Sequence, residues 1–217
     1  MLQSLMRASV LFVTAGLVAV GCSSTTGPDP ADVPGYPERT SPENVIAKFE
    51  AAYEAMDAEE YLDCLSEDFV FFVNPGDTQG WQPLPESWDR AVEDTVAWRM
   101  FRESSGIDSI RVWMTPEGDP EEVPGQGPGD PSSWRYTYDA TVSVHLPQDI
   151  WFYADCRAVL IVRPDADDLV RDGRQLWEIA EHHDFDESLR GSREMPSWSR
   201  IKAYFGGLYD ERNARRE

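Results

Sequence analysis

Apolar residues recur every three or four positions in the segment that follows Ser41, which is the spacing of one face of a helix. Ser41 suits the N-cap, Pro42 fits the first helical position, and Glu43 complements the positive end of the helix dipole. The pattern predicts a helix from about residue 42, and similar patterns predict helices at about 58–65 and 87–103. The apolar face of the first helix carries Val45, Ile46, Phe49, Ala52, Tyr53 and Met56.

The period of the pattern changes to two in the second half of the chain. From Trp134 to Leu146, apolar residues alternate strictly with polar ones, which is typical of a strand with one buried and one exposed face. Pro147 to Asp149 make a tight reversal, so this strand and the next are expected to form a long antiparallel hairpin. The predicted strands are 69–73, 107–114, 134–146, 150–163 and 175–183, and a short closing helix is predicted at 197–205.

Helices first and antiparallel strands afterwards indicate an α+β protein. We expect the N-terminal helices to pack on one face of a strongly curved antiparallel sheet, in one domain of residues 42–205. Residues 115–133 are rich in Gly, Pro and acidic side chains, which predicts a mobile loop between two strands. Residues 206–217 are expected to form a C-terminal tail.

The first residues have the composition of a targeting segment. A weakly basic head is followed by the apolar run Ala8–Val20, which is about 13 residues long, whereas roughly 20 are needed to span a bilayer. The run leads into small residues directly before Cys22, which suits cleavage by a signal peptidase. Residues 1–21 are therefore predicted to be a secretory signal peptide and not a membrane-spanning anchor.

The segment Ala19-Val20-Gly21-Cys22 resembles the lipobox of bacterial lipoproteins, in which the Cys thiol receives a diacylglycerol and the freed amine a further acyl chain. This resemblance implies a protein of the bacterial cell envelope that is held on the lipid bilayer through Cys22, with residues 22–41 as a flexible tether. Ser23 is not the Asp that retains some lipoproteins on the inner membrane, so the outer membrane is the expected location. The alternative is a secreted protein whose mature form happens to begin with Cys.

The charge of the chain excludes several classes of partner. Forty acidic side chains against nineteen basic ones give a formal charge of −21 and a pI near 4.4. Such a chain repels phosphate backbones and anionic lipid headgroups, so nucleic acid is not an expected partner. Hydrophobic residues make up 41% of the chain, which excludes disorder of the whole chain.

The order of the predicted elements resembles the nuclear transport factor 2-like superfamily, also called SnoaL-like. The segments that carry this resemblance are Ser41–Ile46, Ala51–Tyr53 before Asp57, Tyr61 with Leu65–Val70, and Trp177–Ile179 with His183-Asp184. The resemblance covers residues 42–185 and implies a cone-shaped fold, or cystatin-like roll, with a hydrophobic pocket between sheet and helices. Some relatives are enzymes such as ketosteroid isomerases and polyketide cyclases, and many others only bind ligands or form dimers. The implied pocket would be lined by Tyr53, Phe71, Tyr136, Tyr138, Trp177 and Ile179.

An isomerase or dehydratase of this kind needs a base inside the pocket, close to a hydroxyl that can hold an enolate oxygen. Strict alternation places His183 on the same strand face as Trp177 and Ile179, so His183 is the candidate base and Tyr138 the candidate hydroxyl donor. The competing interpretation is a solvated His183 at a strand end and a Tyr138 that only fills the core.

No metal site and no cofactor are predicted. His182 and His183 are adjacent on a strand and therefore point to opposite faces, and no other His or Cys joins them at ligand spacing. Cys64 and Cys156 lie in apolar surroundings and are either buried free thiols, which we favour, or a helix-to-sheet disulfide.

Two functions follow from these observations. The first is a tethered, non-catalytic cone-fold domain that binds a small apolar ligand or a protein partner, with a homodimer through the sheet as a further expectation. The alternative is an isomerase or dehydratase that uses His183 with a tyrosine. Fold class alone does not decide between them.

Overall fold

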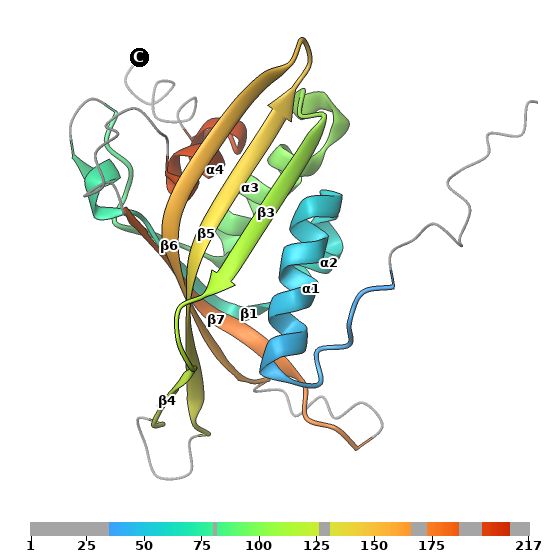
Figure 1. Cartoon of the computed structure of the whole chain (residues 1–217), viewed down its shortest axis with the longest axis vertical. Coiled ribbons are helices and arrows are strands. Elements are labelled where there is room, and N and C mark those ends of the chain that lie inside the picture. Colours follow the sequence, from blue (N-terminus) through green and yellow to red (C-terminus); the bar gives the residue numbers. More distant parts are fainter. Residues whose placement is uncertain (1–34, 80–81, 126–130, 166–172, 187–196, 209–217) are drawn as a thin grey trace, which may run out of the picture. The chain divides into compact units, whose positions relative to one another are not determined.

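The computed structural model separates the chain into residues 1–35 and residues 36–217, and only the second unit is described below (Figure 1). The residues that the structure describes are 35–79, 82–125, 131–165, 173–186 and 197–208. Cys22 and the predicted signal peptide lie outside them.

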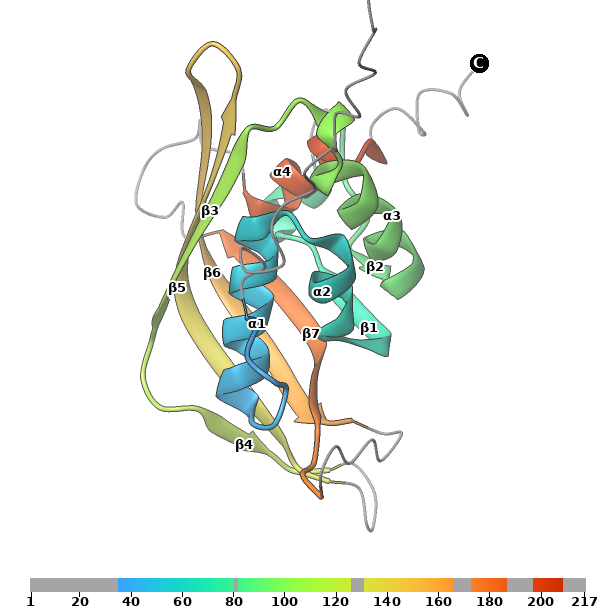
Figure 2. The ribbon, with the colours of Figure 1, turned by 90° about the vertical axis from the view of Figure 1, so that its right-hand side faces the viewer.

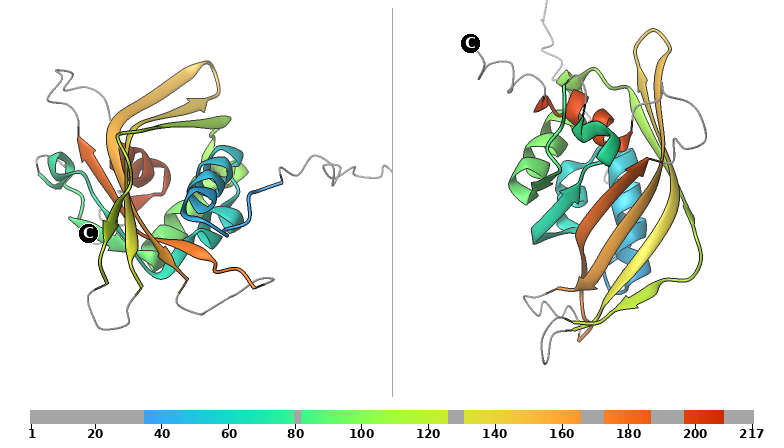
Figure 3. Two further views of the ribbon diagram at one scale, coloured as in Figure 1. Left: turned by 60° about the horizontal axis from the view of Figure 1, so that its bottom comes forward. Right: turned by 90° about the vertical axis from the view of Figure 1, so that its left-hand side faces the viewer.

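The described residues form a sheet of seven strands in the order β2-β1-β7-β6-β5-β3, with β4 paired to β5. It curves around the helices (Figures 1 and 3). This confirms the predicted α+β class with helices on a curved sheet, but the sheet is mixed, because β1 and β7 pair in parallel. The strands are β1 Leu65–Phe72, β2 Ser87–Asp89, β3 Ser109–Pro116, β4 Glu121–Val123, β5 Ser133–Leu146, β6 Ile150–Pro164 and β7 Trp177–Asp186.

The helices lie on one side of the sheet (Figure 2). The predicted cap at the start of the first helix is present, since Ser41 Oγ accepts a hydrogen bond of 3.2 Å from the amide of Asn44. None of the helices in the described ranges is long and apolar enough to cross a membrane. The α-helices are α1 Pro42–Ala55, α2 Ala58–Asp63, α3 Arg90–Phe101 and α4 Trp198–Phe205, and the 3-10 turns are η1 Pro75–Thr78 and η2 Glu103–Ser105.

Two predicted boundaries are wrong. The third helix begins at Arg90 and not at 87, because Asp89 is its N-cap and Ser87–Asp89 pair with β1 as strand β2. The predicted mobile loop 115–133 contains β4, whose Glu121 pairs with Arg135 of β5, so its first half extends the sheet.

The predicted tether also ends earlier than residue 41. The carbonyl of Arg39 accepts a hydrogen bond of 2.8 Å from the amide of Trp177, and the Arg39 guanidinium forms a 3.2 Å ion pair with Asp63. The Tyr36 hydroxyl donates to Asp57 over 3.1 Å. These contacts bind the residues directly before α1 to α2 and β7.

An irregularity in β7 changes which side chains face the core. Ile179 pairs with Val162 and Glu181 pairs with Ile161, so Ala180 is an additional residue in the ladder, a β-bulge. Beyond the bulge His182 and Asp184 face the interior, as Ile179 does before it. The alternation that was expected to place His183 on the face of Ile179 is therefore wrong.

The edge strand β3 is covered by α1. The carboxylate of Glu54 accepts a hydrogen bond of 3.0 Å from the amide of Val112. This amide would otherwise be open to pairing with another strand. The contact therefore blocks regular strand addition at this point of the edge.

Candidate functional site

Helix α4 occupies the space between the sheet and the other helices (Figure 2). Trp198 is completely buried, and its ring centroid lies 5.5 Å from that of Tyr53 and 4.7 Å from that of His182. Its indole nitrogen donates a hydrogen bond of 3.0 Å to the hydroxyl of Tyr53. The interior in which a pocket was expected therefore holds a side chain of the protein itself.

A buried ion pair between Lys202 of α4 and Glu93 of α3 lies next to this ring. The ammonium group is 2.7 Å from one Glu93 oxygen and donates over 3.0 Å to the Tyr61 hydroxyl, which itself donates over 2.6 Å to the same oxygen. The other Glu93 oxygen accepts a 2.7 Å hydrogen bond from the indole of Trp88. The ammonium also lies 4.3 Å from the ring centroid of Phe71.

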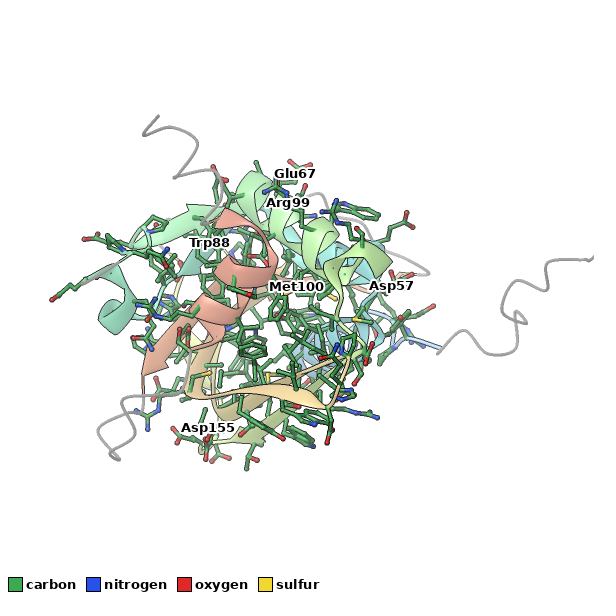
Figure 4. The ribbon with its side chains drawn as sticks, turned by 90° about the horizontal axis from the view of Figure 1, so that it is seen from above. Asp57, Glu67, Trp88, Arg99, Met100 and Asp155 are labelled. Carbon is green, nitrogen blue, oxygen red and sulfur yellow. The ribbon has the colours of Figure 1, made fainter. Side chains whose placement is uncertain are left out.

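The partners of this pair determine its charge state. Burial lowers the pKa of Lys202, and the carboxylate of Glu93 opposes that shift. Burial raises the pKa of the Tyr61 hydroxyl well above its usual value, so this group stays protonated and donates. In Figure 4, Met100 of α3 points into the same interior, whereas Asp155 of β6 points away from it on the far side of the sheet.

The start of α4 is bound by carboxylates of β7 and η1. Asp184 accepts hydrogen bonds from the backbone amide of Ser199 at 2.7 Å and from its hydroxyl at 2.5 Å. Asp77 accepts from Ser197 and, over 2.5 Å, from the guanidinium of Arg200. Burial raises the pKa of Asp184 to about 6, although the hydrogen bonds from Ser199 favour its charged form.

His182 lies in the aromatic core. Its ring centroid is 4.8 Å from that of Phe71 and 6.0 Å from that of Phe49, and neither ring nitrogen has a hydrogen-bond partner among the described residues. Burial lowers the pKa of His182 well below its usual value, so the imidazole is neutral.

Five of the six predicted pocket residues face the interior, and the sixth lies at its rim. Tyr53, Phe71 and Ile179 are fully buried in the interior. Tyr136 and Tyr138 also face inwards and stack with centroids 6.4 Å apart, and the Tyr136 hydroxyl donates over 2.8 Å to Glu43 of α1. Burial raises the pKa of Tyr138 to about 12. Trp177 is half-buried at the rim, where its backbone pairs with Arg39.

The two predicted catalytic residues are not brought together. His183 lies on the outer face of the sheet, where its ring stacks on Phe72 with centroids 4.1 Å apart and Nε2 lies 2.7 Å from Glu181. Tyr138 lies on the inner face, two strands away. The bulge at Ala180 explains this separation, because it reverses the faces of the residues that follow.

An open cleft of about 810 Å³ lies outside the interior, near the ends of β6 and β7. Two of its charged lining residues, Arg163 and Asp68, form an ion pair, and Arg163 also lies 2.9 Å from Glu178. No group of three or more potential metal ligands occurs among the described residues. The cleft is lined by Asp68, Val123, Pro124, Gly125, Pro131, Ser133, Ile161, Arg163, Pro164, Asp165, Gln175, Ala180 and Glu181.

Sequence reasoning missed the buried ion pair between Lys202 and Glu93. Lys202 stands between apolar residues of a short helix, and Glu93 lies more than a hundred residues away, so no local spacing relates them. The favoured interpretation of the two cysteines as buried free thiols is confirmed, since Cys64 and Cys156 are both free and buried.

No family model matches the chain, and no curated protein matches it. Among solved structures it is similar to a conserved protein from Planctomyces limnophilus (13% identity, TM-score 0.47, 66% of this chain and 91% of that one). It is also similar to a ketosteroid isomerase-like protein from Erwinia carotovora (14%, 0.42, 67% and 93%). A third is a nuclear transport factor 2-like superfamily protein from Salmonella enterica (10%, 0.44, 70% and 92%). At these values no residue role or activity is transferred from them.

Replacing Lys202 by Met should strongly destabilise the domain. The change leaves the Glu93 carboxylate buried without a cation, and losing one partner of a buried pair costs about 3–5 kcal/mol. Urea unfolding followed by tryptophan fluorescence measures the loss. Arg135→Met is the control, because its 3.5 Å pair with Glu121 is exposed, and such a pair is worth less than about 1 kcal/mol. Equal losses in the two variants would contradict the role of the buried pair.

Asp184 should give the domain a measurable pH dependence. Because its pKa is about 6 in the fold and 3.8 is the ordinary value, the folded state holds the proton more tightly, so this group lowers stability as pH rises from about 4 to above 6. Asp184→Asn keeps an acceptor for Ser199 and removes that effect. The free energy of unfolding of the variant minus that of the wild type should rise over this range, by up to about 3 kcal/mol. A difference that is flat or falls would refute the assignment, and Asp155→Asn serves as an exposed control.

Proposed function

We propose that the protein is a lipid-anchored, non-catalytic binding protein of the bacterial cell envelope, and that it binds a protein partner through its exterior. The observation that carries this proposal is the occupation of the interior by α4. Trp198 and Lys202 have no exposed surface, and their polar atoms are bonded to Tyr53, Tyr61 and Glu93.

The positions of the acid and base groups also favour binding over catalysis. A general base must reach the proton that it removes within hydrogen-bond distance, directly or through one water. His183 and Tyr138 lie on opposite faces of the sheet, and Glu93 is held between the donors of Lys202, Tyr61 and Trp88.

A small apolar ligand is the second candidate, because the rings around Trp198 would make an apolar pocket if α4 moved away. Phe49, Tyr53 and His182 each have a ring centroid within 6.2 Å of that of Trp198. The ligand would have to replace both the packing and the indole hydrogen bond to Tyr53.

Binding of free indole distinguishes a protein partner from a small apolar ligand, because indole is the ring system of the Trp198 side chain. Trp198→Ala should cost about 3–5 kcal/mol of stability, and added indole should restore part of the lost thermal stability by filling the space and donating to Tyr53. The wild type should show no saturable binding of indole by calorimetry. Trp113→Ala removes an exposed ring and should respond to indole as the wild type does. Saturable, one-to-one binding by the wild type would overturn the proposal in favour of an apolar ligand site.

The anchor is tested by Cys22→Ser in the full chain expressed in a bacterium with two membranes. The wild type should enter the outer-membrane fraction, with an N-terminal peptide heavier by a diacylglycerol and an acyl chain, and the variant should lose both properties. Cys64→Ser is the matched control, because the hydroxyl can keep the thiol's hydrogen bond to the carbonyl of Glu60. Membrane attachment that survives Cys22→Ser would refute lipidation at this residue.

A further inference from the structure

The outer face of the sheet carries large exposed rings on β3 and β6, with the partly buried ring of His145 on β5 between them. Trp113 of β3 is 53% exposed, and Trp151 and Tyr153 of β6 are 41% and 42% exposed. His145 of β5 stacks on Trp151 with centroids 4.2 Å apart, and Trp151 is nearly parallel to Tyr153, with 17° between the rings. We call these four residues the outer platform. Figure 2 shows that the helices of the described chain lie on the other side of these strands.

Carboxylates border this platform. Asp149 accepts a 3.0 Å hydrogen bond from the indole of Trp151 and is 89% exposed. Asp155 is also exposed and accepts a 2.7 Å hydrogen bond from Thr141 of β5, which pairs on its other side with Trp113 of β3. Asp108 lies 3.8 Å from His145 on the opposite border.

The basic groups nearby are fewer. Arg111 lies in the same cross-strand row as Ser143 and Tyr153, and Arg157, further along β6, forms a 2.8 Å ion pair with Glu117. The Ser143 hydroxyl, in the row between Arg111 and Tyr153, is buried and has no hydrogen-bond partner among the described residues. The border is therefore acidic, and one polar group beneath it is unsatisfied.

We propose that the outer platform docks a basic segment of a partner protein. An Arg guanidinium stacks flat on an indole or phenol ring and donates hydrogen bonds sideways, so the rings of Trp151 and Trp113 with Asp149 and Asp155 offer both parts of its binding. The formal charge of −21 adds a long-range field that draws a basic partner towards the domain. This inference rests on the proposed function, because it specifies the exterior surface and the chemistry of its partner.

Other occupants fit the same face less well. A second copy of the chain, which is the predicted homodimer through the sheet, would bring together two surfaces that each carry Asp108, Asp149 and Asp155 against only Arg111 and Arg157, and an excess of like charge across an interface is unfavourable. Anionic lipid and nucleic acid are repelled for the same reason. Addition of a strand at β3 is opposed by the hydrogen bond between Glu54 and Val112.

The test measures binding of a fluorescent peptide to the purified full chain by anisotropy. The probe is a short peptide of alternating Arg and Gly, and peptides with Lys or Gln in place of Arg are compared with it at low and at physiological ionic strength. We expect the Arg peptide to bind most tightly, the Lys peptide more weakly and the Gln peptide not measurably, with affinity falling as salt rises. Trp151→Ala should weaken binding of the Arg peptide about three- to tenfold without changing the net charge.

Matched variants separate docking from general attraction to an acidic protein. Trp98→Ala removes a ring of similar exposure on α3 and is compared with Trp151→Ala. Glu59→Gln removes a carboxylate on α2 and is compared with Asp155→Asn at the border of the platform. Each control variant should bind the Arg peptide more tightly than the variant with which it is compared. Equal affinities within each pair, or equal binding of the Gln peptide, would overturn the inference.

Sedimentation of the full chain tests the competing homodimer. A monomer supports the inference, and a dimer that Trp151→Ala dissociates overturns it. The indole experiment tests the proposed function separately, so the proposed function and the inference about the outer platform can fail independently.

Discussion

The ion pair between Lys202 and Glu93 is the interaction on which the interior depends. Taking two charges out of water costs several kcal/mol each, and the cost is offset only when geometry and hydrogen bonding are good. Here Glu93 has three donors, and Lys202 also lies over the ring of Phe71. Because these groups come from α2, β2, α3, α4 and β1, the pair has its full set of partners only when all five elements are in place.

That constraint determines what the interior can do. Once α4 is docked by Lys202, its N-terminal end is held by Asp184 and Asp77, and Trp198 is completely buried among the rings of the interior. Gly206, directly after α4, allows close approach to α3, since a Cβ there would lie 2.8 Å from a methyl group of Val96. The helix is therefore an integral part of the core.

The sequence predicts the local features of this fold and not the long-range ones. The helix from Pro42 follows from its cap and apolar spacing, and the hairpin of β5 and β6 follows from strict alternation around Pro147–Asp149. The bulge at Ala180 has no signal in the alternation, and one inserted residue exchanges the faces of His182 and His183. The assignment of His183 to the pocket failed at this one residue.

The carboxylates on the two sides of the sheet differ in whether they remain available to bind another molecule. On the inner side, the carboxylates of Asp184 on β7 and Glu93 on the facing helix α3 are desolvated and hydrogen-bonded by the chain's own side chains, so a ligand there would have to break those contacts. On the outer face, Asp149 and Asp155 accept hydrogen bonds from neighbouring neutral side chains and remain in water beside exposed rings. Among the described residues, neither carboxylate forms an ion pair with Lys or Arg that an incoming cation would have to displace. This is the physical reason to look for recognition on the outer face.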